Sequence, residues 1–275
     1  MLPRIPGLSR LKRQVRYLAG YLDFASPGPT RRAADFDRAS RPVLLLHGFL
    51  ATRRAVEILE RRLCRDGYTV FSFDLGGAGQ LFRRGVDDLA DLVRTKVERL
   101  YARHPGLGPL TIVGHSQGGL VGAWYVKKLG GWRRVRALVT LGTPHQGTPA
   151  AFAGLPLALL APALWQMTPG SGFVQRLWRG AWPPGVGLSS LWSRADRLAP
   201  YPSALVETLG LPYVRNVEVA AQGHRDFLFR RRIYDALLQE LRAGDEAAPV
   251  RLRRLRPSPE PAAALPSAVD ALQAG

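Results

Sequence analysis

The sequence predicts an α/β fold in which a mostly parallel central sheet carries helices on both faces. From residue 42 onward, short apolar runs alternate with longer segments of helical periodicity, which is typical of consecutive β-α-β units. These runs are apolar throughout rather than at every second position, as expected of strands covered on both faces. With 275 residues, of which 46% are hydrophobic, the chain can bury one large core. We therefore expect one α/β domain over residues 42–244.

The expected elements alternate regularly as far as residue 141 and resume after residue 185. Strands are expected at 43–46, 69–73, 110–113, 135–141, 186–192 and 214–220, and helices at 53–65, 86–104, 118–129 and 227–241. The single cysteine, Cys64, falls within the first of these helices and is expected to be a buried small residue. One cysteine excludes an intramolecular disulfide and a Cys-x-x-Cys metal site.

Residues 150–185 interrupt this alternation. They are rich in Leu, Ala, Pro, Gly and Trp and show no clear period. Because the segment joins two strands of the sheet, it should emerge at their carboxyl ends, where we expect it to fold down as a lid over an acyl pocket. The apolar residues that support this expectation are Leu157, Leu159, Leu160, Leu164, Trp165, Phe173, Leu177 and Trp178. The alternative is that the segment packs as an ordinary satellite of the core.

The two ends of the chain differ in composition from the domain between them. Residues 1–25 contain a basic amphipathic helix over 8–24, which can lie on an anionic membrane surface or pack on the domain behind it. Residues 26–41 begin with Ser-Pro-Gly-Pro-Thr and are predicted to be a linker. Residues 245–275 are rich in Ala and Pro and are predicted to be a disordered tail.

The charge of the chain bears on its partners. Lys and Arg total 39 against 21 Asp and Glu, which gives a formal charge of +18. The basic residues are spread along the chain without a dense block, so a nucleic-acid partner is not expected, and attraction to anionic lipid is favoured over it. The sequence contains no secretory signal pattern and no apolar span of 18 residues, so we expect a cytoplasmic protein. Its oligomeric state is left open.

The strongest chemical signal is Gly114-His115-Ser116-Gln117-Gly118, which fits the pattern G-x-S-x-G. It lies between an apolar strand and a helical run, where a nucleophile elbow is found. The flanking glycines allow a tight turn and a close approach of neighbouring backbone. The serine hydroxyl is then presented above the sheet at a helix N-terminus, where developing negative charge is stabilised. Ser116 is therefore the candidate nucleophile.

The candidate base follows from the chain order Ser, acid, His that this kind of elbow requires. Of the five histidines, only His145 and His224 come after Ser116. No Asp or Glu lies between Ser116 and His145, so His145 leaves no room for an acid. His224 follows the last expected strand and is the candidate base.

The candidate acid must lie between Ser116 and His224, where the carboxylates are Asp196, Glu207 and Glu218. Glu218 falls inside an expected strand, and Glu207 in the helical segment before it. Asp196 comes just after an apolar strand and is the candidate for holding the imidazole in the right tautomer. The alternative for Asp196 is a surface ion pair with a neighbouring arginine.

The oxyanion hole is expected to draw on the first strand of the domain, which ends in His47-Gly48-Phe49. This turn allows the Phe49 N–H to point at the acyl oxygen, while Gln117, which follows the nucleophile, supplies the second N–H. His47 then orients the loop. No cluster of His, Cys and carboxylates at ligand spacing occurs near these residues, so we expect neither a metal nor another cofactor.

Taken together, Leu-Leu-His-Gly-Phe, Gly-His-Ser-Gln-Gly-Gly and Leu-Gly-Thr-Pro-His-Gln-Gly-Thr resemble the bacterial lipase and esterase branch of the α/β-hydrolase superfamily. The resemblance covers about residues 42–242 and implies hydrolysis of carboxylic esters with Ser116, Asp196 and His224 as the triad. It also implies that His145 supports the site rather than reacts. The fold is expected to be abridged, because residues 1–41 offer no convincing first two strands. The signal peptide, disulfide and aspartate-lined calcium site of many secreted relatives are not found.

Three interpretations remain open from the sequence. The first is an ester hydrolase for apolar acyl chains that works through an acyl-enzyme on a small-molecule or lipid substrate. The second is an acyltransferase or thioesterase on the same triad. The third is a lipid- or membrane-binding module that keeps the fold without turnover.

Overall fold

The computed structural model describes residues 39, 41–75, 83–153, 161–221 and 223–255. The expected helix at 8–24 and most of the expected linker lie outside the described residues. Leu157, Leu159 and Leu160 of the predicted lid lie outside them as well. The described part contains the whole expected α/β domain except for the gaps at 76–82, 154–160 and 222.

Six strands form one sheet in which every pair of neighbours is parallel. They are β1 (Pro42–Leu46), β2 (Thr69–Ser72), β3 (Leu110–His115), β4 (Val135–Leu141), β5 (Gly187–Trp192) and β6 (Val214–Glu218), in the order β2-β1-β3-β4-β5-β6. The predicted α/β class is confirmed, and the strand positions agree closely with the apolar runs of the sequence. A parallel sheet covered on both faces also explains why the runs of the inner strands β1, β3, β4 and β5 do not alternate, while the edge strands β2 and β6 are only partly buried.

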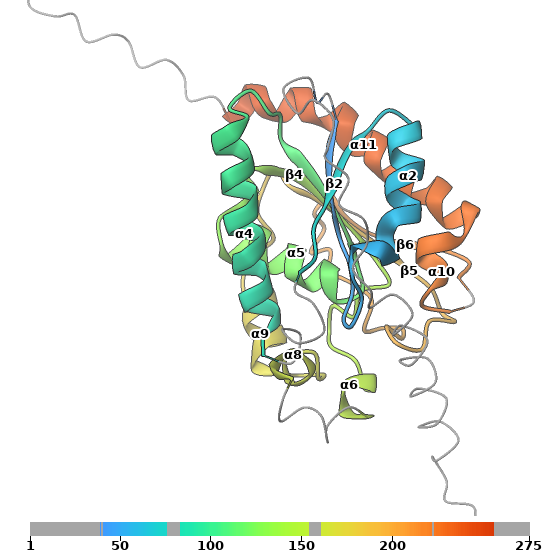
Figure 1. Cartoon of the computed structure of the whole chain (residues 1–275). Coiled ribbons are helices and arrows are strands. Elements are labelled where there is room, and N and C mark those ends of the chain that lie inside the picture. The colour runs from blue at the N-terminus through green and yellow to red at the C-terminus, as the bar shows by residue number, and fades with distance from the viewer. Residues whose placement is uncertain (1–38, 40, 76–82, 154–160, 222, 256–275) are drawn as a thin grey trace, which may run out of the picture.

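Helices cover both faces of the sheet, as Figure 1 shows. The helices α4 (Val86–Arg103) and α5 (Gln117–Lys128) lie on one face, and α2 (Glu57–Arg65), α10 (Asp226–Phe229) and α11 (Arg231–Leu255) on the other. The strand β1 contributes Leu44 and Leu46 to the core under α4 and α5. It contributes Val43 and Leu45 to the core under α2 and α11. The domain therefore has two apolar layers, one on each side of the sheet.

The strand order places a topological switch point between β1 and β3. The chain passes from β1 to β2 at the edge and then crosses back to β3 on the other side of β1. Loops that leave β1 and β3 at their carboxyl ends therefore diverge and leave a crevice, which is where open α/β sheets bind ligands. The expected oxyanion turn follows β1 and the expected nucleophile follows β3, so both lie at this point.

The segment 150–185 divides into two parts. It contains α6 (Ala150–Ala153), α8 (Pro162–Gln166) and α9 (Gly172–Trp178), near the lower end of Figure 1. The helix α9 packs on α5, where the rings of Phe173 and Trp124 stack at 4.7 Å, so this part is core, as the satellite alternative holds. In contrast, Phe152 on α6 and Trp165 on α8 are 48% and 47% exposed. A lid role therefore stays a prediction for α6 and α8 only.

Two features of the structure differ from the expectations. The helix α11 runs to Leu255, past the expected domain end at 244 and into the segment 245–275 that the composition predicts to be a disordered tail, and an ion pair of 2.5 Å between Arg136 on β4 and Asp245 ties the helix to the sheet. The rest of that segment, 256–275, lies outside the described residues. Cys64 is exposed rather than buried, because Leu59 and Leu63 supply the buried face of α2. Smaller elements complete the described chain, namely the 3-10 helices η2 (Arg53–Val56) and η3 (Gly131–Arg133). Within the described ranges, no helix has the length and apolar character needed to cross a bilayer.

Candidate active site

Ser116 forms a sharp turn between β3 and α5. Its backbone has φ 55° and ψ −126°, a left-handed conformation that residues other than glycine rarely adopt. Such strain persists only where neighbouring contacts fix it. Here the Ser116 N–H donates to the Leu141 carbonyl at 2.9 Å, and the Thr143 hydroxyl donates to the Ser116 carbonyl at 2.9 Å. The turn therefore has the backbone geometry of a nucleophile elbow.

The glycines of the motif allow the close packing that this turn needs. A Cβ atom on Gly118 would lie 2.4 Å from the Leu46 carbonyl oxygen at the end of β1. A Cβ atom on Gly114 would lie 2.6 Å from the Gly119 backbone in the first turn of α5. Both neighbours are backbone atoms, which cannot move aside cheaply. The G-x-S-x-G pattern is thus required sterically in this fold.

Asp196 and His224 meet at the same edge of the sheet. Asp196 lies four residues after β5 and His224 six residues after β6. His224 Nδ1 lies 2.7 Å from Asp196 Oδ2, and both side chains are almost fully buried. Because the carboxylate accepts this hydrogen bond, the proton is on Nδ1, and Nε2 is the nitrogen with a lone pair. That is the tautomer that a general base needs.

The Asp196 carboxylate is held by the backbone as well. Its other oxygen, Oδ1, accepts hydrogen bonds from the N–H groups of Leu198 at 2.9 Å and Ala199 at 3.0 Å. Glu218, one of the other two carboxylates, is instead paired with Arg194 at 3.0 Å. Glu207 is exposed. Of the three candidate acids, Asp196 is the one that the structure places against His224.

The acid and base lie beside the elbow. The His224 ring is 4.8 Å from the His115 ring, centroid to centroid, and His115 Nε2 donates to the His224 carbonyl at 3.2 Å. A Cβ atom on Gly142, just past β4, would lie 2.9 Å from Asp196 Oδ2. The loops after β3, β4, β5 and β6 thus converge, with the residue that precedes Ser116 in contact with His224.

Comparison with protein families identifies the fold. The model of the α/β hydrolase fold family matches residues 41–179, which is about half of the chain. The chain belongs to the α/β-hydrolase fold family. A comparison with curated proteins finds no significant match.

Solved structures share the fold of this α/β-hydrolase at low sequence identity. Lipase B of Aspergillus fumigatus is 17% identical with a TM-score of 0.62, over 78% of this chain and 55% of the fungal chain. The mature Bacillus licheniformis lipase BlEst2 is 17% identical with a TM-score of 0.57, over 77% of this chain and 96% of the bacterial chain. The Paleococcus ferrophilus monoacylglycerol lipase is 16% identical with a TM-score of 0.56, over 75% of this chain and 94% of the lipase chain. The chain thus spans about half the length of the fungal lipase.

The loop after β1 in this α/β-hydrolase approaches the elbow closely. A Cβ atom on Gly48 would lie 2.9 Å from the Ser116 Cβ, so no other residue would fit there without displacing the serine. The buried His47 ring accepts a hydrogen bond from the Leu75 N–H at Nε2, at 3.1 Å. Its Nδ1 therefore carries the proton and donates to the Gly48 carbonyl at 3.0 Å. These contacts place Phe49 next to the elbow.

Three buried histidines around the site are held neutral. Burial lowers the pKa of His47 and takes the pKa of His145 to about 3. Burial, together with the nearby His224, lowers the pKa of His115 well below its ordinary value. His145 hydrogen-bonds the Thr140 hydroxyl at 2.9 Å and accepts the Trp178 indole N–H at its carbonyl at 2.7 Å. It therefore ties the end of β4 to α9.

Gln117 begins α5, and its side chain is buried. Its backbone N–H belongs to the first turn of the helix, where N–H groups have no partner inside the helix and are available to an oxyanion. Among the residues that the structure describes, no group of three His, Cys, Asp or Glu side chains could hold a metal ion. The chemistry that these residues offer is nucleophilic and acid–base.

Proposed function

We propose that this α/β-hydrolase cleaves carboxylic esters with apolar acyl chains through an acyl-enzyme on Ser116. The observation that carries the proposal is the buried 2.7 Å hydrogen bond between His224 and Asp196, next to a serine in a left-handed turn. A serine of ordinary acidity needs such a base to become nucleophilic. The motif order Ser, Asp, His along the chain supports the same assignment.

The proposed reaction runs in two halves. The Ser116 hydroxyl oxygen attacks the ester carbonyl carbon while its proton passes to His224 Nε2. The N–H groups of Phe49 and Gln117 stabilise the oxyanion of the tetrahedral intermediate. His224 then gives the proton to the leaving alcohol, and a water molecule, activated by the same nitrogen, releases the acid from Ser116. Asp196 holds the imidazole throughout and stabilises its charged form.

Two observations support an ester with an apolar acyl chain. The solved structures that share the fold include two lipases and a monoacylglycerol lipase. The exposed rings of Phe152 and Trp165 lie on helices that follow β4, at the carboxyl edge where Ser116 also lies. Such rings gain free energy by covering an apolar chain. We propose that α6 and α8 form the acyl-binding lid.

The test combines active-site labelling with a substrate series. A fluorophosphonate probe is expected to modify Ser116 in the full chain, as mapped by mass spectrometry, and to leave Ser116→Ala unlabelled. A series of p-nitrophenyl esters is then compared with acyl-CoA substrates. Preferred turnover of medium-chain esters supports the proposal, while preference for acyl-CoA would favour a thioesterase. Transfer of the acyl group to an added alcohol rather than to water would favour an acyltransferase. Absence of labelling would leave a binding module without turnover.

We further propose that the basic segment 8–24 brings this enzyme to anionic membranes from the cytoplasmic side. The net charge of +18 supports an attraction to such surfaces. Co-sedimentation of the full chain with vesicles, with and without anionic lipid, tests it. Equal binding to both kinds of vesicle would contradict it.

A further inference from the structure

The loop between β1 and η2, residues 47–52, has a strained backbone. Leu50 has φ 56°, again in the left-handed region that favours glycine. Strain of this kind is kept only when the two ends of a loop are held from outside. The same loop carries Gly48, which packs against Ser116, and Phe49, the proposed oxyanion donor. A small shift of the loop therefore alters the site directly.

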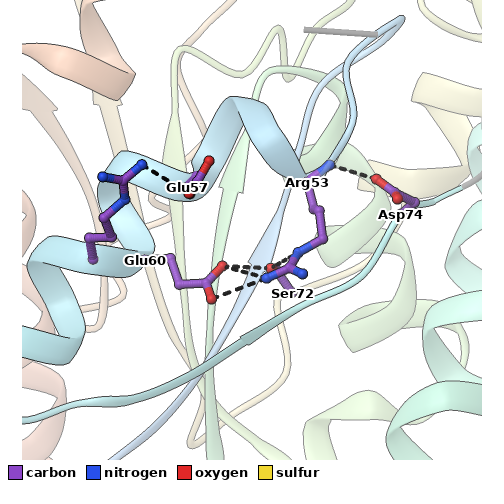
Figure 2. A network of polar contacts seen from close by, with 6 residues as sticks. Arg53, Glu57, Glu60, Ser72 and Asp74 are labelled. Atoms are coloured by element: carbon purple, nitrogen blue, oxygen red, sulfur yellow. Dashed lines mark hydrogen bonds and ion pairs between the residues drawn. The ribbon is translucent and has the colours of Figure 1, made fainter. Parts of the chain in front are cut away.

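The segment that follows β2 holds both ends of this loop. At the start, the Leu75 N–H donates to His47 Nε2 at 3.1 Å. At the finish, the Arg53 N–H donates to Asp74 Oδ1 at 2.6 Å, as Figure 2 shows. The two adjacent residues Asp74 and Leu75, just after β2, thus fix the span of the loop.

The Arg53 side chain continues from this point into a buried polar cluster, drawn in Figure 2. Arg53 Nη2 lies 3.2 Å from both oxygens of Glu60, and Arg53 Nε donates to the Ser72 hydroxyl at 3.1 Å. The Ser72 hydroxyl in turn donates to Glu60 at 2.9 Å. The Arg53 and Glu60 side chains are 10% and 9% exposed. Because Nη2 contacts both Glu60 oxygens while Nε contacts Ser72, the guanidinium is held by two partners, which fixes its direction as well as its distance.

We infer that the Arg53–Glu60–Ser72 cluster is a positioning device for the oxyanion hole. It joins α2 and β2 to Arg53, the first residue after the loop, and so limits the movement of Gly48, which packs against Ser116, and of the proposed donor Phe49. The inference rests on the proposed ester hydrolysis and adds to it a set of residues that do not touch the substrate. A buried ion pair is weak grounds for stability alone, since apolar residues often serve as well. The Arg53–Glu60 pair therefore needs a reason other than stability, and positioning of the loop supplies one that apolar packing would not.

The test is Glu60→Gln in the full chain, with Glu57→Gln as its matched control. Glu57 lies on the same helix, but its carboxylate is paired at 2.9 Å with the exposed Arg61 rather than with Arg53. Active sites are titrated with a fluorophosphonate, so that kcat refers to folded enzyme only. We expect Glu60→Gln to lower kcat about 10- to 100-fold with KM changed less than about 3-fold, because misplacement of the oxyanion donor affects the transition state. Glu57→Gln should stay within about twofold of wild type.

A second readout separates positioning from folding. An alkyl boronic acid forms a tetrahedral adduct on the serine and places an oxygen in the oxyanion hole, so its affinity should fall by about the same factor as kcat/KM. Ser72→Ala, which keeps both charges, should give a smaller loss of the same kind and covers the case in which Glu60→Gln does not fold. The inference would be overturned if Glu60→Gln had normal kcat and normal boronate affinity. If Glu60→Gln does not fold, the same result in Ser72→Ala would overturn it. Either outcome would leave the proposed ester hydrolysis unaffected. Absence of ester turnover by the wild-type chain would overturn both.

Discussion

The two halves of the candidate active site are built differently. The half on β1 and β3 is held by close packing at glycines, since Cβ atoms on Gly48 and Gly118 would meet neighbours at 2.9 and 2.4 Å. The half on β5 and β6 is held by hydrogen bonds between longer loops. The Ser193 hydroxyl, just past β5, donates to the Ala221 carbonyl, just past β6, at 2.8 Å. Atoms added at these glycines should therefore disrupt the first half, whose loop after β1 also depends on the Arg53–Glu60–Ser72 cluster. The second half should be disrupted mainly by removal of its polar groups.

The largest expected effect is loss of the reacting groups from either half. Ser116→Ala and His224→Ala should each lower kcat on the order of 10³- to 10⁶-fold, because triad members act as a unit. Turnover of a p-nitrophenyl ester checks this, and the double variant should lose little beyond either single one. Additive losses in the double variant would contradict a shared step.

Asp196→Asn should show a milder loss of the same kind, about 10³- to 10⁴-fold, because the amide cannot hold the His224 proton in the right tautomer. The matched controls are Glu218→Gln, which removes the exposed partner of Arg194, and Glu207→Gln. Both controls should keep kcat within about twofold. If kcat of Asp196→Asn stayed within tenfold of wild type while kcat of one control fell by more than that, Asp196 would not be the acid.

Addition of one methyl group sharpens the contrast between the halves. Gly118→Ala should destabilise the protein by about 2–3 kcal/mol, since its Cβ meets the Leu46 carbonyl and the backbone must shift. Gly106→Ala is the control, because nothing lies within 4 Å of the added atom. Urea unfolding measures both, and Gly106→Ala should change stability by less than about 0.5 kcal/mol. Equal effects would show that the elbow is not tightly packed.

The buried His145 makes stability depend on pH. Burial holds its pKa at about 3 in the folded chain, below the ordinary value of 6.5. Between these values the unfolded chain binds the proton and the folded chain does not, so stability is full above pH 6.5 and falls as the pH drops. The loss from this residue should reach about 2 kcal/mol at pH 5. Urea midpoints at pH 7.5 and pH 5 should therefore differ less in His145→Asn than in wild type; an unchanged difference would contradict the assignment.

The smallest expected effect concerns the exposed part of the 150–185 segment. Trp165→Ala should change the ratio of octanoyl to acetyl ester turnover by about 3- to 10-fold, since fewer apolar atoms cover the acyl chain. Stability should change little because the ring is 47% exposed. The matched control is Trp132→Ala, because Trp132 is 42% exposed on η3, at the amino end of β4 and therefore away from the carboxyl ends where Ser116 lies. This control should leave the ratio unchanged. Equal scaling of kcat/KM for both esters in Trp165→Ala would show that α8 only packs.

Much of the fold and the candidate site follows from local patterns in the sequence. The inner strands are runs of apolar residues because a parallel sheet buries both of their faces, as Val43 and Leu44 show by facing opposite cores. The elbow is equally local, since five consecutive residues meet its steric demands. The order Ser116, Asp196, His224 narrows the acid and base to few candidates because the chain contains few carboxylates and histidines in that interval.

Other features were decided by tertiary contacts between residues distant in the sequence. The pairing of Asp196 with His224, of Arg53 with Glu60 and Ser72, and of Arg136 with Asp245 arises where loops and helices meet, and no periodicity encodes such meetings. Composition could not separate the core part of 150–185 from its exposed part, since both are apolar. Burial depends on which surface a side chain faces, and that surface exists only once the sheet has formed.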